Sequence, residues 1–187
     1  MANNCFYDMH VKGKPADVDK FKEMLTDYDL PKHFFRVFEA YEYDRSDNPD
    51  GTVTAMISGD CAWSVAACMT KDNPLTYCST FDDGTSLAEQ SAELDLDIEV
   101  YAEETGMCFA EHYLYKKGEE KANEETRLDL YQFEPSDWDA WENRTPEAMA
   151  EFAEFKDDWD LPNITPDDVD PDCGDVRIGG FEVLWHV

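Results

Sequence analysis

Residues 98–116 carry the clearest alternation of apolar and polar side chains in the sequence. Two runs have the two-residue period of a half-buried strand, and Thr105 and Gly106 lie between them. The positions that share a face are Ile98 and Val100 in the first run, and Phe109, Glu111, Tyr113 and Tyr115 in the second. Because glycine reaches positive φ without a Cβ clash, the pattern predicts two paired strands with a tight corner at Gly106.

The sequence before residue 134 alternates strand-like and helix-like patterns. Residues 15–27 place apolar side chains at helical spacing, and Ser86 with Glu89 forms a capping box ahead of a short helix. The run at residues 62–69 fits a strand or a short helix, and we interpret it as a strand. Further strands are expected at residues 5–11, 34–43, 52–58 and 127–133, with a turn at residues 47–51. This order predicts an α+β fold with a ferredoxin-like βαββαβ core and extra strands.

The composition becomes strongly acidic in the last third of the chain. Residues 134–175 contain 15 Asp or Glu against two basic residues, a net charge of −13 in 42 residues. Thr145 caps an amphipathic helix in this stretch, and residues 180–187 alternate like a final strand. We therefore expect a ferredoxin-like domain at residues 1–133 and an acidic helical extension at residues 134–187, whose last strand returns to the sheet.

The charge of the whole chain narrows its possible partners. There are 44 Asp and Glu against 15 Lys and Arg, a net charge of −29 at pH 7. A field of this sign repels nucleic acid and anionic membranes and attracts basic protein surfaces, so direct DNA binding is disfavoured. Solubility alone does not account for this charge, because a small soluble domain usually needs a net charge with a magnitude of only about 2 to 8. Adaptation to high salt is also disfavoured, because Lys outnumbers Arg ten to five and six cysteines are present.

The apolar pattern also bears on the cellular compartment. The first residues alternate like a strand rather than a signal peptide, and no apolar run approaches the roughly 20 residues of a membrane span. We therefore expect the protein in the cytoplasm of a bacterial host cell. Thiols stay reduced there, so most of the cysteines are expected to serve as small buried apolar residues.

Glu103, Glu104, Glu111 and His112 are the candidates for acid–base or metal chemistry. Consecutive residues of a strand point to opposite faces, so at most one of Glu111 and His112 belongs to any single site. The structural interpretation is therefore preferred for this group. No catalytic residue and no cofactor is expected.

Two further patterns partly resemble metal sites. Cys61, Cys68 and Cys78 lack the paired spacing of a zinc knuckle. Residues 168–175 alternate carboxylates like a calcium loop, but Cys173 occupies the position of the required glycine and Gly179 that of the bidentate glutamate. Both patterns are rejected as metal sites, although looser cation binding at residues 168–175 stays open.

Three segments resemble the YubB-type ferredoxin-like family of phage, plasmid and mobile-element proteins. They are MANNC at residues 1–5, SGDCAWS at residues 58–64 and EETGMCFAEHYLY at residues 103–115. The resemblance covers roughly residues 1–120 and departs from the family at Asn4 and Thr105, where many members have Trp and Pro. It implies a ferredoxin-like fold and a mobile-element origin, and it implies no established activity.

The charge and this setting together predict a non-enzymatic inhibitor of a basic nucleic-acid-binding host defence protein. The form that we favour is an anti-CRISPR protein that mimics DNA and binds a Cas nuclease, a step that rests on analogy. The alternatives are a homodimeric structural or assembly module of a phage or plasmid, and an enzyme that uses residues 103–112. The residues expected to contact the partner are Glu134, Asp137, Trp138, Asp139, Trp141, Glu142, Asp157, Asp158, Asp160, Asp167, Asp168, Asp170 and Asp172.

Overall fold

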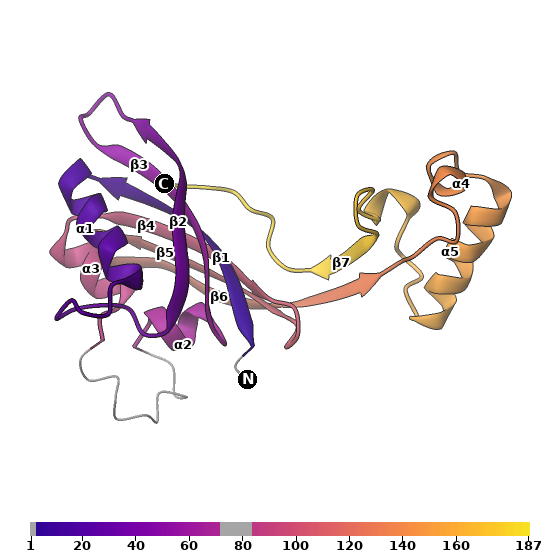
Figure 1. Ribbon diagram of the computed structural model, residues 1–187, viewed down its shortest axis with the longest axis horizontal. Coiled ribbons are helices and arrows are strands. Elements are labelled where there is room, and N and C mark those ends of the chain that lie inside the picture. Colours follow the sequence, from indigo (N-terminus) through magenta and orange to yellow (C-terminus); the bar gives the residue numbers. More distant parts are fainter. Residues whose placement is uncertain (1–2, 72–83) are drawn as a thin grey trace. The chain divides into compact units, whose positions relative to one another are not determined.

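The computed structural model describes residues 3–71 and 84–187, and within them the fold is mixed α+β (Figure 1). The strands are β1 (Asn4–Gly13), β2 (Val37–Asp47), β3 (Val53–Ala62), β4 (Asp97–Glu104), β5 (Phe109–Lys116), β6 (Glu119–Gln132) and β7 (Asp175–Gly179). The α-helices are α1 (Pro15–Thr26), α2 (Val65–Met69), α3 (Leu87–Glu93), α4 (Trp138–Glu142) and α5 (Pro146–Asp158). The strands follow the order β2-β3-β1-β4-β5-β6-β7, and every pair is antiparallel.

The chain divides into two units. The first comprises Met1–Arg127 together with Gly180–Val187, and the second comprises Leu128–Gly179. The boundary lies within β6, six residues before the predicted one at residue 133. Among the helices of the described residues, none combines the length and the apolar character that crossing a lipid bilayer requires.

The core of the first unit lies between its sheet and helices α1 and α3. Alternate residues of β1 are at most 3% exposed, and they are Cys5, Tyr7, Met9 and Val11. α1 packs on β1 and β2 with Val18, Phe21 and Leu25 fully buried, and α3 packs on β4 and β5. The predicted strand at residues 5–11, the helix at residues 15–27 and the capping box of Ser86 with Glu89 are therefore confirmed.

The predicted strand pair at residues 98–116 is confirmed as β4 and β5, with Val100 opposite Tyr113. The corner between them differs from the prediction, because Cys108 rather than Gly106 has positive φ, at 59°. The carboxylate of Glu104 accepts the main-chain N–H groups of Gly106 and Met107. These hydrogen bonds shape the corner, and its positive-φ residue lies two residues later than glycine preference alone suggests.

The prediction of a strand at residues 62–69 is wrong, because Val65–Met69 form α2. Ser64 caps this helix by accepting the N–H of Ala67 at 2.9 Å. The buried carboxylate of Glu111 accepts the N–H groups of Val65 and Ala66 at 2.7 and 3.1 Å. A short apolar run can form a helix when its first main-chain N–H groups find hydrogen-bond acceptors. Here the acceptor is a side chain that is distant in the sequence.

The second unit contains its own apolar cluster. β7 pairs with the end of β6, and Thr145 caps α5 by accepting the N–H of Ala148, which confirms the helix predicted there. The buried residues of the cluster are Phe133, Trp141, Ala148, Phe152, Leu161, Ile164, Val169 and Val176. The acidic stretch therefore folds around aromatic packing within residues 128–179.

The predicted final strand at residues 180–187 is wrong, because residues 181–187 form no strand. Gly179 and Gly180 both have positive φ, at 86° and 79°, which ends β7. The segment returns to the first unit and lies against side chains such as Tyr101 and Glu99, which alternate with the buried Ile98 and Val100 of β4. It therefore covers the sheet face opposite α1 and α3, held by side chains instead of a strand ladder.

Candidate functional site

The carboxylate of Glu99 is the centre of a polar cluster on the covered face of the sheet. Glu99 is 0% exposed although it is charged. Its Oε1 atom lies 3.0 Å from Nε2 of His112 and 2.8 Å from Nδ1 of His186, and its Oε2 accepts the main-chain N–H of His186 at 2.5 Å. Burial raises the pKa of Glu99, but the bonds from His186 and His112 outweigh it and hold the pKa below its usual value.

His112 is fixed from both sides of its ring. Its Nδ1 atom lies 3.3 Å from Oε2 of Glu124 on β6, and its ring stacks on Tyr101 at a centroid distance of 4.2 Å. The hydroxyl of Tyr101 in turn donates to the carbonyl of Leu184 at 3.1 Å. Three strands and the C-terminal segment therefore hold one imidazole ring in place.

Trp185 closes the cluster on the side of β1. Its ring stacks on His10 at 3.6 Å and meets Tyr101 edge-on at 5.0 Å. Burial under this ring lowers the pKa of His10, although the carbonyl of Val187, 3.5 Å from its Nδ1 atom, opposes the shift. The side chain of His186 is 55% exposed, so one edge of the cluster is open to solvent.

The residues predicted as an acid–base group do not form one site. Glu111 faces α2 and also accepts a hydrogen bond from the hydroxyl of Tyr113 at 2.9 Å. His112 faces the opposite side of the sheet, toward Glu99. The predicted separation of Glu111 and His112 is therefore confirmed. Glu104 bonds to the corner that follows β4, and Glu103 is half-buried on β4.

Glu111 is 1% exposed, and its ionisation is perturbed. Burial raises the pKa of Glu111, and the hydrogen bonds from Tyr113, Ala66 and Val65 only partly oppose the shift. The carboxyl group holds the start of α2 against the sheet. Its role is therefore structural.

Three cysteines gather in the core of the first unit. Cys5, Cys61 and Cys68 are buried and free. Hydrogen bonding with Cys5 and then with Cys68, together with burial, raises the pKa of the Cys61 thiol well above its usual value. These three side chains pack as small buried apolar residues, as the sequence predicts for most of the cysteines. Cys78 lies outside the described residues.

The predicted partner-binding residues of the acidic stretch differ in exposure. All their carboxylates are exposed, and Trp138 is 38% exposed. Trp141 is 3% exposed, and it packs on Phe133 at 4.8 Å and on Phe152 at 5.3 Å. The prediction that Trp141 contacts a partner is therefore wrong, because the ring belongs to the core of the second unit.

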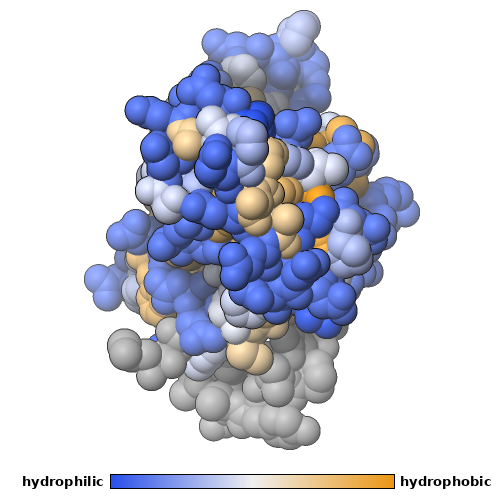
Figure 2. Space-filling view, turned by 90° about the vertical axis from the view of Figure 1, so that its right-hand side faces the viewer, coloured by the Kyte–Doolittle hydropathy of each residue, from blue (hydrophilic) through white to orange (hydrophobic). Residues whose placement is uncertain are grey.

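Some of these carboxylates have local structural roles. Asp137 caps α4 by accepting the N–H of Ala140, and Asp168 accepts the N–H and the hydroxyl of Thr165. Asp170 accepts the N–H groups of residues 172 and 173. The alternating carboxylates at residues 168–175 therefore stabilise their own loop. Asp157 and Asp158 lie instead at the C-terminal end of α5. In Figure 2, hydrophilic residues cover most of the face of the molecule that is turned toward the viewer.

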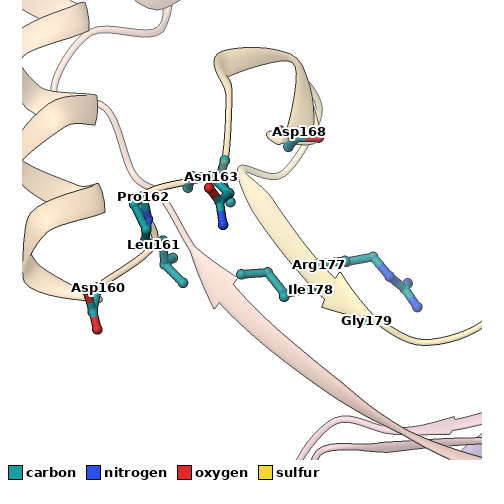
Figure 3. Close-up of a pocket in the computed structure, with 9 residues that line it drawn as sticks. Asp160, Leu161, Pro162, Asn163, Asp168, Arg177, Ile178 and Gly179 are labelled. Atoms are coloured by element: carbon teal, nitrogen blue, oxygen red, sulfur yellow. The ribbon is translucent and has the colours of Figure 1, made fainter.

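A shallow pocket of about 400 Å³ lies in the second unit. Leu161 and Ile178 face each other across it, and the side chain of Arg177 extends away from Leu161 (Figure 3). Asp160 and Asp168 are at its rim. The pocket is open to solvent, so it offers little enclosure to a small molecule.

Comparisons with protein-family models, curated proteins and solved structures find no match to this chain. Function must therefore be argued from the geometry. Sequence reasoning missed Glu99 and His186, because only the strand register and the returning C-terminal segment bring them to His112. For Glu99 the sequence holds one signal, the alternation along β4. Glu99 and Tyr101 lie two residues apart and share a face, and Tyr101 is opposite His112.

Proposed function

We propose that this protein is a non-enzymatic acidic inhibitor that occupies the basic surface of a nucleic-acid-binding protein. The favoured partner is a Cas nuclease, which the protein would block as a DNA mimic of the anti-CRISPR type. The observation that carries the proposal is the surface of Leu128–Gly179, where every predicted contact carboxylate is exposed. Lys and Arg of such a partner would meet these carboxylates in place of phosphates.

The density of charge supports this proposal. Leu128–Gly179 has 16 Asp or Glu against three basic residues, a net charge of −13 in 52 residues. The rest of the chain has 28 against 12, a net charge of −16 in 135 residues. The second unit therefore carries about twice the charge per residue, as a surface that competes with the closely spaced phosphates of DNA requires.

The basic residues of the second unit offset only a small part of this surface. The guanidinium of Arg144 lies 4.3 Å from the ring centre of Trp141 and 3.4 Å from Oδ1 of Asp167, one of the predicted contact carboxylates. Lys156 donates to the carbonyl of Ile164 at 2.6 Å. With Arg177, the cations of this unit number three against 16 carboxylates, so negative charge dominates the field at the surface.

Asp157 and Asp158 supply a further argument. They occupy the last turn of α5, where the helix macrodipole is negative and a carboxylate lowers helix stability. Helix stability therefore does not explain two acidic residues at this end. Binding of a basic partner would explain them.

We also propose that β1 to β4, with α1 and α3 in the connections, form a ferredoxin-like core. The proposal is supported by the antiparallel order β2-β3-β1-β4 and by the packing of α1 and α3 against these strands. It agrees with the resemblance of residues 1–120 to the YubB-type family. That resemblance implies a phage, plasmid or mobile-element origin, and in the cytoplasm of a bacterial host a defence protein would be the target.

The experiment is a pull-down with the full chain from a bacterial lysate that contains CRISPR nucleases, with DNA as competitor. Recovery of a Cas nuclease that DNA displaces supports the proposal. The triple variant Asp157→Asn, Asp158→Asn and Asp160→Asn should lose most of the recovered nuclease. The matched control, Glu23→Gln, Glu39→Gln and Asp47→Asn, removes three exposed charges from the first unit and should keep it. Failure to recover any basic nucleic-acid-binding protein would overturn the proposal.

A homodimeric assembly module is the second candidate function. It is favoured by exposed apolar residues in the second unit, because Trp159 is 57% and Leu130 is 38% exposed. Light scattering of the purified chain separates the two functions. A stable dimer that Trp159→Ala converts to a monomer favours the module, and a monomer favours the inhibitor.

A further inference from the structure

We propose that Glu99, His112 and His186 bind one transition-metal ion of the zinc class, which fastens the C-terminal segment to the sheet. The three donor atoms are a carboxylate oxygen and two imidazole nitrogens, and all lie within 4.8 Å of one another. They come from β4, β5 and the segment after β7. A bound ion would therefore join strands to a segment that has no ladder of its own.

The spacing of the donors suits a small ion. A tetrahedral zinc site with ligands at about 2.0–2.2 Å separates its donor atoms by about 3.4 Å. Oxygen Oε1 of Glu99 already lies 3.0 Å from Nε2 of His112 and 2.8 Å from Nδ1 of His186. Opening these contacts by a few tenths of an ångström is within the reach of side-chain rotation, particularly for the half-exposed His186.

The second contact of His112 gives an independent argument. Its two ring nitrogens face the carboxylate oxygens of Glu99 and Glu124, at 3.0 and 3.3 Å. With a metal at Nε2, the Nδ1–H group is placed to donate to Glu124. This carboxylate–histidine–metal arrangement is the usual support of a histidine ligand.

The donor set selects the kind of ion. Two imidazoles and one carboxylate suit divalent first-row ions such as Fe²⁺, Co²⁺, Ni²⁺ and Zn²⁺, whereas Mg²⁺ and Ca²⁺ favour sites made of oxygen alone. His186 is 55% exposed, so water can reach the fourth tetrahedral position. The rings of Tyr101 and Trp185 enclose the remaining sides. The site is distinct from the acidic surface of Leu128–Gly179, where carboxylates alone would bind any divalent cation weakly.

The test is titration of the full-length, metal-free chain with Co²⁺ and then Zn²⁺ in the presence of excess Mg²⁺, followed by absorption spectroscopy and calorimetry. Excess Mg²⁺ saturates the surface carboxylates. The expected result is one Co²⁺ per chain with the visible bands of a four-coordinate site, displacement by Zn²⁺, and a higher melting temperature of the loaded protein.

The variants make this test specific. His186→Ala should abolish the one-to-one site, and the chain should still fold because this side chain is half-exposed. Glu124→Gln should weaken binding about 10- to 100-fold. His33→Ala is the matched control and should bind as the wild type does, since the ring of His33 contacts the carbonyl of Leu30 outside the cluster.

Three outcomes would overturn the proposal. The first is the absence of saturable binding of one ion in Mg²⁺. The second is unchanged binding in His186→Ala. The third is an intense sulfur-to-cobalt band, which would place the ion on cysteine thiols instead.

Discussion

The carboxylate of Glu99 receives both the main-chain N–H and the imidazole of His186, at 2.5 and 2.8 Å, across a separation of 87 residues. The fully buried carboxylate of Glu99 is thus hydrogen-bonded to a residue that follows the second unit in the sequence. Residues 180–187 are therefore part of the first unit. The chain cannot be divided at one point without exposing this carboxylate.

Glu99→Gln should destabilise the first unit. The substitution keeps the shape but replaces a charged acceptor by an amide, and hydrogen bonds to charged groups contribute about 1.5–3 kcal/mol each in favourable cases. We expect a loss of free energy of unfolding of about that size at pH 7, measured by urea denaturation. An unchanged free energy would mean that the contacts with His186 and His112 contribute nothing net.

The same carboxylate predicts a pH dependence. The pKa of Glu99 is lower in the folded than in the unfolded chain, so its stabilisation is complete above the unfolded pKa, about 4.3. The stabilisation is lost as the pH falls through the folded pKa. The difference in free energy of unfolding between wild type and Glu99→Gln should therefore shrink as the pH falls below about 4. A difference that keeps growing below about pH 4 would contradict this assignment.

Glu111 should behave in the opposite way. Burial raises its pKa in the folded chain, so the folded state keeps a proton that the unfolded state releases. Stability attributable to Glu111 is therefore present below about pH 4 and declines as the pH rises through the folded pKa. Denaturation of Glu111→Gln at a series of pH values should show the wild type at its greatest relative advantage in acid. A constant difference would show that Glu111 ionises normally.

Trp185→Ala should loosen the C-terminal segment. The ring loses its stacking on His10 and its edge contact with Tyr101, and aromatic pairs contribute about 0.5–1.5 kcal/mol each. We expect a loss of about 1–3 kcal/mol and faster hydrogen exchange at residues 181–187. Leu184→Ala, which truncates a neighbour that is 56% exposed, is the matched control and should change the free energy by less than about 0.5 kcal/mol. Equal effects of both variants would argue against a specific role of Trp185.

Neutralising the end of α5 should stabilise the second unit. Asp157→Asn with Asp158→Asn removes two negative charges from the negative end of the helix macrodipole. The expected gain is up to about 1 kcal/mol for both together at low ionic strength, and it should fade as salt is added. Calorimetric scans at low and high salt measure it. A lower melting temperature would show that these carboxylates support the fold, which would weaken the argument that they serve binding.

Local periodicity predicted much of the fold. The alternation in β1, β4 and β5 and the caps of α3 and α5 are encoded within a few residues, so these elements appear as predicted. The pattern at residues 62–69 does not reveal α2, because the acceptor for the first N–H groups of this helix, Glu111, lies more than 40 residues away in the sequence. Residues 180–187 alternate like a strand, but two glycines at positive φ turn them across the sheet.

The candidate sites divide in the same way. Exposure of the carboxylates in the acidic stretch follows from their composition. The burial of Trp141 does not, because it depends on contacts with Phe133 and Phe152. The group of Glu99, His112 and His186 depends on strand register and on the path of the last eight residues. Neither the register nor this path can be read from a local sequence pattern, because both depend on the complete fold.

The most direct measurement is the salt dependence of binding to the basic partner. If carboxylates of Leu128–Gly179 replace phosphates, the logarithm of the dissociation constant should rise steeply with the logarithm of salt concentration. The slope should fall in the triple variant of Asp157, Asp158 and Asp160 and stay unchanged in the matched control of the first unit. An affinity that does not change between low and moderate salt would contradict nucleic-acid mimicry.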